Sequence, residues 1–349
     1  GSGTNSLVLG GTMTLAGGGL MLATGNDNTL YSVTGGAITS GTSNVGGDLY
    51  IWHLPWAGTN RQVAIGSNII NNGTGPVRLV LASSEGAASA NAITLSGTNS
   101  YTGGTVLQKA SVILGGTAGQ VMIPAGAVTL FNSTITTTAT GGVIASSNSV
   151  TLDGYSTLVL GGPATLANLV FNNTGGTGTP TVNATGTLTL TGSVTATSQN
   201  TATVATLAGT IDFGGTARTL TVAPIAYGGR VLTTLQPTLA ISGSVRNAGL
   251  LTVTGGGVLQ LSGSTSTFAG GLFVDGTSAV QFGAGSQGAV GAVTAGPLGT
   301  GTLSLASGAR ILSATNTAYT VNNNVAASGN VTFDGVSYAA LTLGGTYFM

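Results

Sequence analysis

The segment ITLSGTNSYTGGTVLQKASVILGG, from Ile93 to Gly116, decides the fold class of this chain. Its apolar residues alternate with small polar residues, and Gly pairs interrupt the alternation. Such alternation is typical of half-buried β-strands, and Gly-rich interruptions are typical of the turns between them. The same order returns from Leu259 to Gly283 as LQLSGSTSTFAGGLFVDGTSAVQFG, with Phe268 in the position of Tyr101 before a Gly-Gly pair. We therefore expect a repeated architectural unit of short strands.

The core LSGTNSYTGGT at residues 95–105 resembles the autotransporter-associated β-strand repeat. That repeat occurs in the passenger regions of bacterial surface proteins and in very long secreted bacterial proteins. The copy at 259–283 departs from the repeat by one inserted residue and lacks the Asn and the Tyr. The flanking segments DLYIWH at 48–53 and GPLGTGTLSLASGA at 296–309 are similar to those that often surround it. The resemblance implies a passenger-type β-helix that is secreted or lies at the cell surface.

Composition indicates an ordered chain that differs from an ordinary globular enzyme. Gly occurs 61 times in 349 residues, and charged residues make up 4% of the chain, where an ordinary domain has about 25%. Disordered segments are poor in apolar residues and rich in charge. Here 42% of the residues are apolar and the mean hydropathy is +0.44, so the chain can bury a core.

Charge and cysteine content exclude several classes of partner. Nucleic-acid binding needs several basic side chains on one patch, whereas this chain has one Lys, Lys109, and isolated Arg residues at a net charge of zero. The absence of cysteine excludes disulfides and thiolate metal sites, and fits a secreted protein that is stabilised by repetition. No apolar run approaches the roughly 20 residues of a membrane-spanning helix, so we expect no membrane insertion by this segment.

A short phrase, apolar–any–apolar–any–Gly, recurs along the chain and marks strands of about five residues that end at Gly. It occurs at residues 7–11, 93–97, 158–162, 188–192, 239–243, 251–255, 259–263 and 341–345. Helix signals are missing because Gly interrupts the windows in which they would form. The pattern is uniform, without a linker or a composition shift, which favours a solenoid over a sandwich.

We therefore predict an all-β fold, a right-handed parallel β-helix that spans residues 1–349 as one elongated rod without a separate domain boundary. Each coil should contain roughly 20 residues and pair with its neighbours. Leu, Val and Ile should point inward in stacked columns, and Thr, Ser and Asn should point outward. Asn side chains could also stack in ladders at the turns.

The aspartates, which are the first candidates for catalysis, occur in patterns that are typical of turns. Asp153-Gly154, Asp275-Gly276 and Asp334-Gly335 fit turns in which Asp caps its own backbone and Gly takes a positive φ. The single histidine, His53, cannot form a zinc site without further ligands. We expect no enzyme, no catalytic residues, no metal site and no cofactor. A polysaccharide-degrading enzyme is a remote alternative, supported only because some polysaccharide-cleaving enzymes have the β-helix fold predicted here.

The segment LYIWHLPW at 49–56 is a local anomaly, because it holds both tryptophans and the only histidine. One hypothesis makes it an interface to sugars or to another chain through the side chains of Tyr50, Trp52, His53 and Trp56. The alternative, which we prefer, makes it a strand and a turn that fill a wide place in the core.

We expect two other groups of aromatic residues to differ in burial. Tyr101 and Phe268 should lie inside the solenoid rather than bind a ligand. The segment LTLGGTYFM at 341–349 carries no charge and includes Tyr347 and Phe348, which are candidate interface residues. The last coil of a solenoid exposes an unpaired strand edge, which proteins normally block with charge or Pro. Because this segment has neither, we expect either further coils of a longer chain or contact with another copy.

These observations favour an extracellular structural fibre or surface-matrix protein that continues or stacks end to end, or associates laterally, into a longer filament. The alternative is an autotransporter-type adhesin passenger that binds glycans or host surfaces. Both hypotheses rest on fold and resemblance more than on a site.

Overall fold

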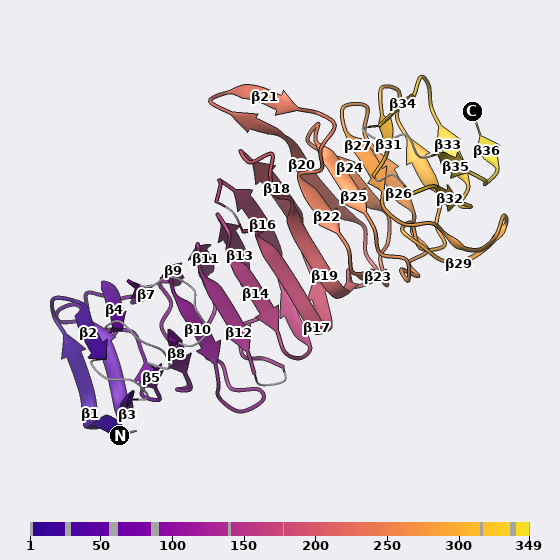
Figure 1. The fold of residues 1–349 in the computed structure, drawn as a ribbon. Helices are drawn as coiled ribbons and strands as arrows, with labels where there is room; N and C mark the ends of the chain where they lie inside the picture. Colours follow the sequence, from indigo (N-terminus) through magenta and orange to yellow (C-terminus); the bar gives the residue numbers. More distant parts are fainter. Residues whose placement is uncertain are drawn as a thin grey trace. The chain divides into compact units, whose positions relative to one another are not determined.

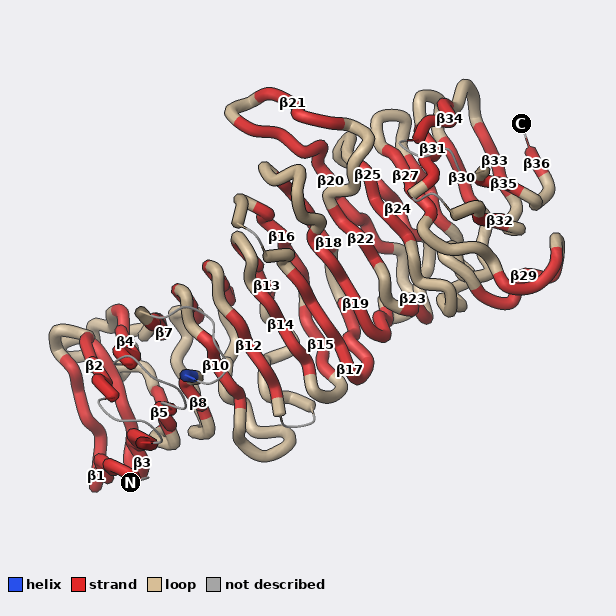
Figure 2. The backbone as a smooth tube through the Cα atoms, viewed as in Figure 1, coloured by secondary structure: helices blue, strands red, loops and turns tan. Residues whose placement is uncertain are grey.

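The structure is a computed structural model that describes residues 3–24, 29–55, 62–84, 91–138, 141–176, 178–314, 317–335 and 340–348. These residues form β-strands, turns and loops, with a 3-10 helical residue at Asn91 that is blue in Figure 2, and no α-helix occurs among them. Accordingly, this part of the chain offers no helix long and apolar enough to span a membrane. The chain divides into two compact units, Gly1–Ala167 and Asn168–Met349, which are described in turn.

In the first unit the chain runs alternately through two sheets (Figure 1). The first sheet contains β1 (Gly3–Leu15), β3 (Thr29–Ser40), β5 (Gln62–Ile65), β6 (Asn68–Ile69), β8 (Ile93–Leu95), β10 (Ser111–Leu114), β12 (Thr134–Thr137), β14 (Thr157–Leu160) and β15 (Ala164–Leu166). The second sheet contains β2 (Gly19–Thr24), β4 (Asp48–Pro55), β7 (Arg78–Ser83), β9 (Thr105–Gln108), β11 (Ala127–Phe131) and β13 (Ser149–Asp153). Successive strands of each sheet pair in parallel, one coil after another.

The second unit repeats this plan. Its first sheet contains β17 (Thr181–Leu190), β19 (Ala205–Asp212), β22 (Leu239–Ile241), β23 (Ser244–Arg246), β25 (Val258–Leu261), β27 (Ala279–Phe282), β31 (Arg310–Ser313) and β34 (Thr332–Gly335). Its second sheet contains β16 (Asn168–Asn173), β18 (Val194–Ser198), β20 (Arg218–Tyr227), β24 (Leu251–Thr254), β26 (Leu272–Val274), β30 (Leu303–Leu305), β33 (Val325–Ala327) and β36 (Tyr347–Phe348).

Additional strands extend the coils of the second unit. β21 (Arg230–Thr233) forms an antiparallel hairpin with β20, and β28 (Gln287–Ala289) forms another with β29 (Ala292–Ala295). β32 (Tyr319–Val321) pairs in parallel with β35 (Leu341–Leu343). Both hairpins project from the coils that carry them (Figure 1).

The predicted all-β parallel solenoid is confirmed, but its coils vary in length. The coil that brings Val112 beside Ile93 is close to the expected size of roughly 20 residues. The coil that brings Leu239 beside Ala205 is much longer. This longer coil includes the β20–β21 hairpin, which lies outside the ladder and therefore leaves the strand register intact.

Columns of inward side chains form the core of each unit. In the first unit, parallel register aligns five buried residues from successive coils of the second sheet, namely Ile51, Leu81, Leu107, Leu130 and Leu152. Adjacent members lie about 4.8 Å apart along the stack, the spacing of paired strands. Burial of each such side chain stabilises the fold by about 1.5–3 kcal/mol. The strict alternation of the sequence thus becomes a continuous apolar column.

The two repeat-like segments fold in the same way. Tyr101 and Phe268 are both buried, which confirms the prediction that these aromatics lie inside. The first Gly of each following pair approaches an adjacent coil closely. A Cβ on Gly103 would lie 2.6 Å from the backbone carbon of Val77, and one on Gly270 would lie 2.1 Å from that of Gly249. The second Gly of each pair has a positive φ, 89° in one copy and 78° in the other.

At two corners, Asn side chains bond backbone groups of other coils. The buried Asn99 accepts a hydrogen bond from the Ile69 N–H at 2.8 Å and donates to the Met122 carbonyl at 2.6 Å. Asn148 likewise accepts from the Gly126 N–H at 2.8 Å and donates through Nδ2 to the carbonyl of Pro124 at 3.0 Å. Such bonds satisfy backbone groups that leave the ladder at turns.

We predict that Gly103→Ala destabilises the fold by about 1–3 kcal/mol, because the new Cβ would overlap the backbone of Val77. Gly10→Ala is the matched control, since a Cβ there meets nothing within 4 Å. We expect it to change stability by less than about 0.5 kcal/mol. Midpoints of chemical denaturation measure both effects, and equal midpoints for the two variants would contradict the close approach.

A double-mutant cycle tests the polar pair that distinguishes the two repeats. The Tyr101 hydroxyl bonds Thr105 Oγ1 at 2.7 Å in the core, whereas the second copy has apolar Phe268 and Leu272 at these two places. Tyr101→Phe or Thr105→Val alone should cost about 1–2 kcal/mol, because each leaves a buried hydroxyl without its partner. In the double variant the loss should be smaller than the sum of the single losses in denaturation experiments. Simple additivity would show that the pair is not coupled.

Candidate functional site

The segment 49–56 forms most of β4, and alternation divides its candidate residues between two environments. Leu49, Ile51 and His53 point into the core and are fully buried. Tyr50 and Trp52 point outward from the second sheet, with 48% and 51% of their surface exposed. Trp56 lies outside the described residues. The preferred expectation that this segment only fills the core is therefore wrong for Tyr50 and Trp52.

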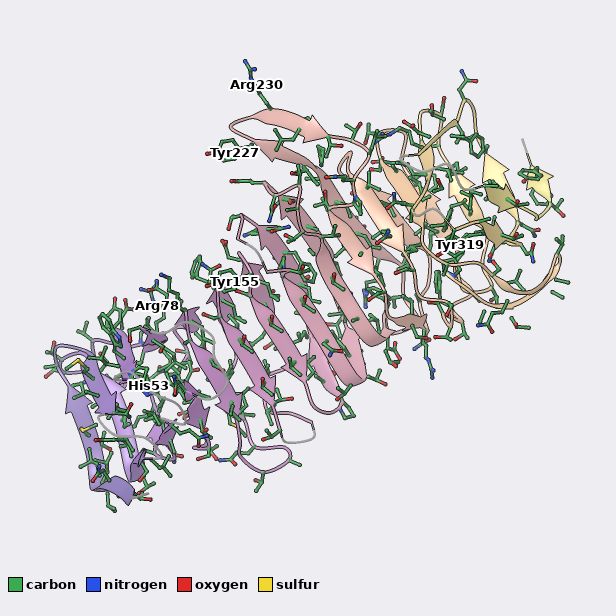
Figure 3. All side chains as sticks on the ribbon, in the orientation of Figure 1. His53, Arg78, Tyr155, Tyr227, Arg230 and Tyr319 are labelled. Atoms are coloured by element: carbon green, nitrogen blue, oxygen red, sulfur yellow. The ribbon has the colours of Figure 1, made fainter. Side chains whose placement is uncertain are left out.

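His53, labelled in Figure 3, is a buried core residue that makes two hydrogen bonds. Its Nδ1 lies 3.1 Å from the carbonyl oxygen of Asn91, which can only accept, so Nδ1 carries the proton. Nε2 then accepts from the Thr24 hydroxyl at 3.3 Å. Burial lowers the pKa of His53 below its usual value, because the charged form would be poorly solvated. Since it is fully buried, His53 is not an interface residue.

We predict that stability falls as the pH drops below about 6.5, the ordinary pKa of His. The unfolded chain then binds a proton that the folded chain resists, so the folded state loses up to about 1.4 kcal/mol per pH unit until the lowered folded-state pKa is reached. His53→Gln should flatten this slope, because His53 is the only histidine. Denaturation midpoints at about pH 7.5 and about pH 5.5 measure the slope. A wild-type slope retained in the variant would assign the titration to another group.

A charged cluster fixes the orientation of Tyr50. Arg78 Nε donates to Asp48 Oδ1 at 2.8 Å, and Arg78 Nη2 donates to Oδ2 at 2.5 Å. Tyr50 donates its hydroxyl to the same Oδ2 at 2.8 Å. The hydrogen bond from Arg78 lowers the pKa of Asp48, and the hydrogen bond to Asp48 raises the pKa of Tyr50. As a surface ion pair the cluster adds little stability, but it positions the ring.

An open groove of about 610 Å³ lies on the outer face of the second sheet in the first unit. Register places Trp52, Ala82, Gln108 and Phe131 in one outward row across β4, β7, β9 and β11. Trp52 and Phe131 are separated by three strand spacings, or about 14 Å. Ala82 and Gln108, which lie between them, have smaller or unbranched side chains. The two aromatic residues therefore border the groove, and these side chains form its floor. Phe131 is 40% exposed.

The corner beside this groove contributes its polar side chains. Lys109 and Asn132 line the groove, and both adopt left-handed backbone conformations with φ of 48°. Gly154 follows in the next coil with φ of 65°. A side chain in this conformation costs roughly 1–2 kcal/mol relative to a right-handed one, and Gly avoids that cost. The first unit thus keeps a Lys and an Asn where the backbone geometry favours Gly.

A second, smaller groove of about 280 Å³ lies on the second sheet of the other unit. Its outward row runs Phe273, Ser304, Ala326 and Phe348, again with aromatic residues three strand spacings apart. Phe348 is 55% exposed and lines this groove. Tyr347 is 54% exposed and donates its hydroxyl to the carbonyl oxygen of Leu343.

The Asp-Gly pairs predicted from the sequence differ from one another in the structure. Asp275 Oδ1 caps its turn by accepting from the backbone N–H groups of Thr277 and Ser278. Its partner Gly276 lacks the expected positive φ and is instead required by close approach, since a Cβ would lie 2.2 Å from the Ser307 oxygen. Asp334-Gly335 ends strand β34, where a turn was predicted. No group of three or more potential metal ligands occurs in the described ranges.

Sequence reasoning named Tyr50 and Trp52 as candidate interface residues, although it preferred a core role for their segment, and it missed Gln108, Lys109 and Phe131. These residues lie in segments that read as ordinary strands and turns, and only the coil-to-coil register brings them beside Trp52. Comparisons with protein-family models, curated proteins and solved structures found no match. The geometry of the outer face therefore defines the candidate site.

Proposed function

We propose that this chain is a non-catalytic, extracellular structural protein whose coils serve as a scaffold in a surface layer or matrix. The observation that carries this proposal is the in-register pairing of successive coils in each unit, reinforced by Asn and Ser side chains that bond the backbone of other coils. Between any two such coils, the hydrogen bonds of the paired strands and the contacts of the core columns together resist an applied force. Stability then increases with each added coil, as in other solenoids.

The outer face of the first sheet supports lateral association of copies. In the first unit, Thr94, Ile113, Thr136 and Val159 form one outward row of β-branched, uncharged side chains. The chain has a net charge of zero, so little repulsion opposes the packing of one copy on another. The four side chains are half-buried, and the apolar part of such a row favours contact with another surface.

We expect particle mass to rise with concentration in light scattering and elongated assemblies to appear by negative-stain electron microscopy. Thr136→Lys should suppress both, because it places an ammonium group in the middle of the uncharged row. Thr201→Lys, at an exposed bend outside the sheets, is the matched control and should assemble as the unmodified chain does. Constant monomer mass at every concentration would contradict the assembly.

A second candidate function is adhesion. The exposed aromatic residues that border a groove in each unit favour it, since aromatic side chains dominate contact energies at binding surfaces. In that case the scaffold would present its outer faces to a glycan or to a cell surface.

A further inference from the structure

We propose that the groove on the second sheet of the first unit binds an acidic oligosaccharide, with Trp52 and Phe131 stacking on sugar rings and Lys109 pairing with a carboxylate. This inference goes beyond the structural role and does not depend on self-assembly. It specifies the ligand class that the adhesive alternative would require.

The backbone around the groove is not available for binding. β4 pairs with β2 and β7, β7 with β4 and β9, and β9 with β7 and β11. An extended peptide binds a sheet by adding a strand to a free edge, and these central strands have none. A ligand on this face is therefore recognised by side chains alone, which suits a molecule that presents flat apolar faces and peripheral polar groups.

The aromatic residues provide such a surface. Trp52 stands at one end of the row and Phe131 at the other, about 14 Å away, so the groove accommodates a short chain of rings rather than a single ring. Tyr50 lies beside Trp52 on the same strand face, and its hydrogen bond to Asp48 holds it in place before any ligand arrives. Preorganisation of this kind lowers the entropic cost of binding.

The charge of the groove favours an anion. Lys109 is the only lysine of the chain and has no ion-pair partner among the described residues. The neighbouring cation, Arg78, is already neutralised by Asp48. Gln108 is exposed next to Lys109 and adds an amide donor for hydroxyl or carboxylate oxygens. Asp153 pairs with Phe131 in the register, and its carboxylate would repel an acidic group of the ligand. The acidic group should therefore lie on the Lys109 side of the groove.

A second copy of the chain fits this groove less well. Stable protein interfaces bury about 800 Å² per partner, whereas the exposed apolar side chains here are a few aromatics interspersed with Gln108 and Lys109. A volume of about 610 Å³ is typical of small-molecule sites. The groove in the second unit has the same aromatic spacing but lacks a lysine, which makes it an internal comparison.

The test is isothermal titration calorimetry of the full chain with trimers of galacturonate and mannuronate and with a hyaluronan tetrasaccharide. The methyl ester of the galacturonate trimer is the matched neutral probe. We expect a Kd of about 0.1–1 mM for at least one acidic probe, weakened by about 0.5 M NaCl. Trp52→Ala and Phe131→Ala should each weaken binding about tenfold or more. Lys109→Gln should reduce affinity for the acid to that for the ester and leave the ester unaffected.

Controls separate this site from the alternatives. Tyr227→Ala removes an exposed aromatic of the β20–β21 hairpin and should leave binding unchanged (Figure 3). Circular dichroism checks that each variant is folded.

Absence of binding by every acidic probe at about 10 mM would overturn the proposal. Equal affinity for acid and ester would overturn the role of Lys109, and loss of self-association in Trp52→Ala without any sugar binding would reassign the groove to a contact between copies.

Discussion

Coil-to-coil register is the constraint on which the other features of each unit depend. Outside the β20–β21 and β28–β29 hairpins, the strands hydrogen-bond in parallel to strands of neighbouring coils, so equivalent positions superpose at the spacing of paired strands, about 4.8 Å. That short spacing is why Gly103 and Gly270 have no room for a Cβ. The same spacing lets buried Asn side chains reach the backbone of another coil. Stacking thus accounts for these particular Gly and Asn residues.

The constraint also organises the outer faces. Because register aligns outward positions as strictly as inward ones, a side chain that is isolated in the sequence becomes part of a row. Trp52 and Phe131 are distant in the sequence, yet they border one groove because three successive strand pairings connect them. A solenoid can therefore build a binding surface from single substitutions in several coils without disturbing the core.

Alternation along one strand gives neighbouring residues opposite roles. In β4, Trp52 faces solvent while His53 is buried and held neutral by its environment. The residues of segment 49–56 are thus not one functional group, although they are adjacent in the sequence. A single strand contributes a titratable group to stability and an aromatic side chain to the surface, and the two can be varied independently.

The sequence by itself determined the all-β class, the parallel solenoid, and the buried positions of Tyr101 and Phe268, because period-two alternation and Gly-Gly pairs are local signals that need no partner. Only the tertiary structure decided which outward residues meet. Coil length varies widely along the chain, and a slip of a single position in the register would reverse every side chain. Sequence reasoning could therefore find Tyr50 and Trp52 as an anomaly but could not bring Gln108, Lys109 and Phe131 to them, since their proximity is a property of hydrogen bonds between distant segments.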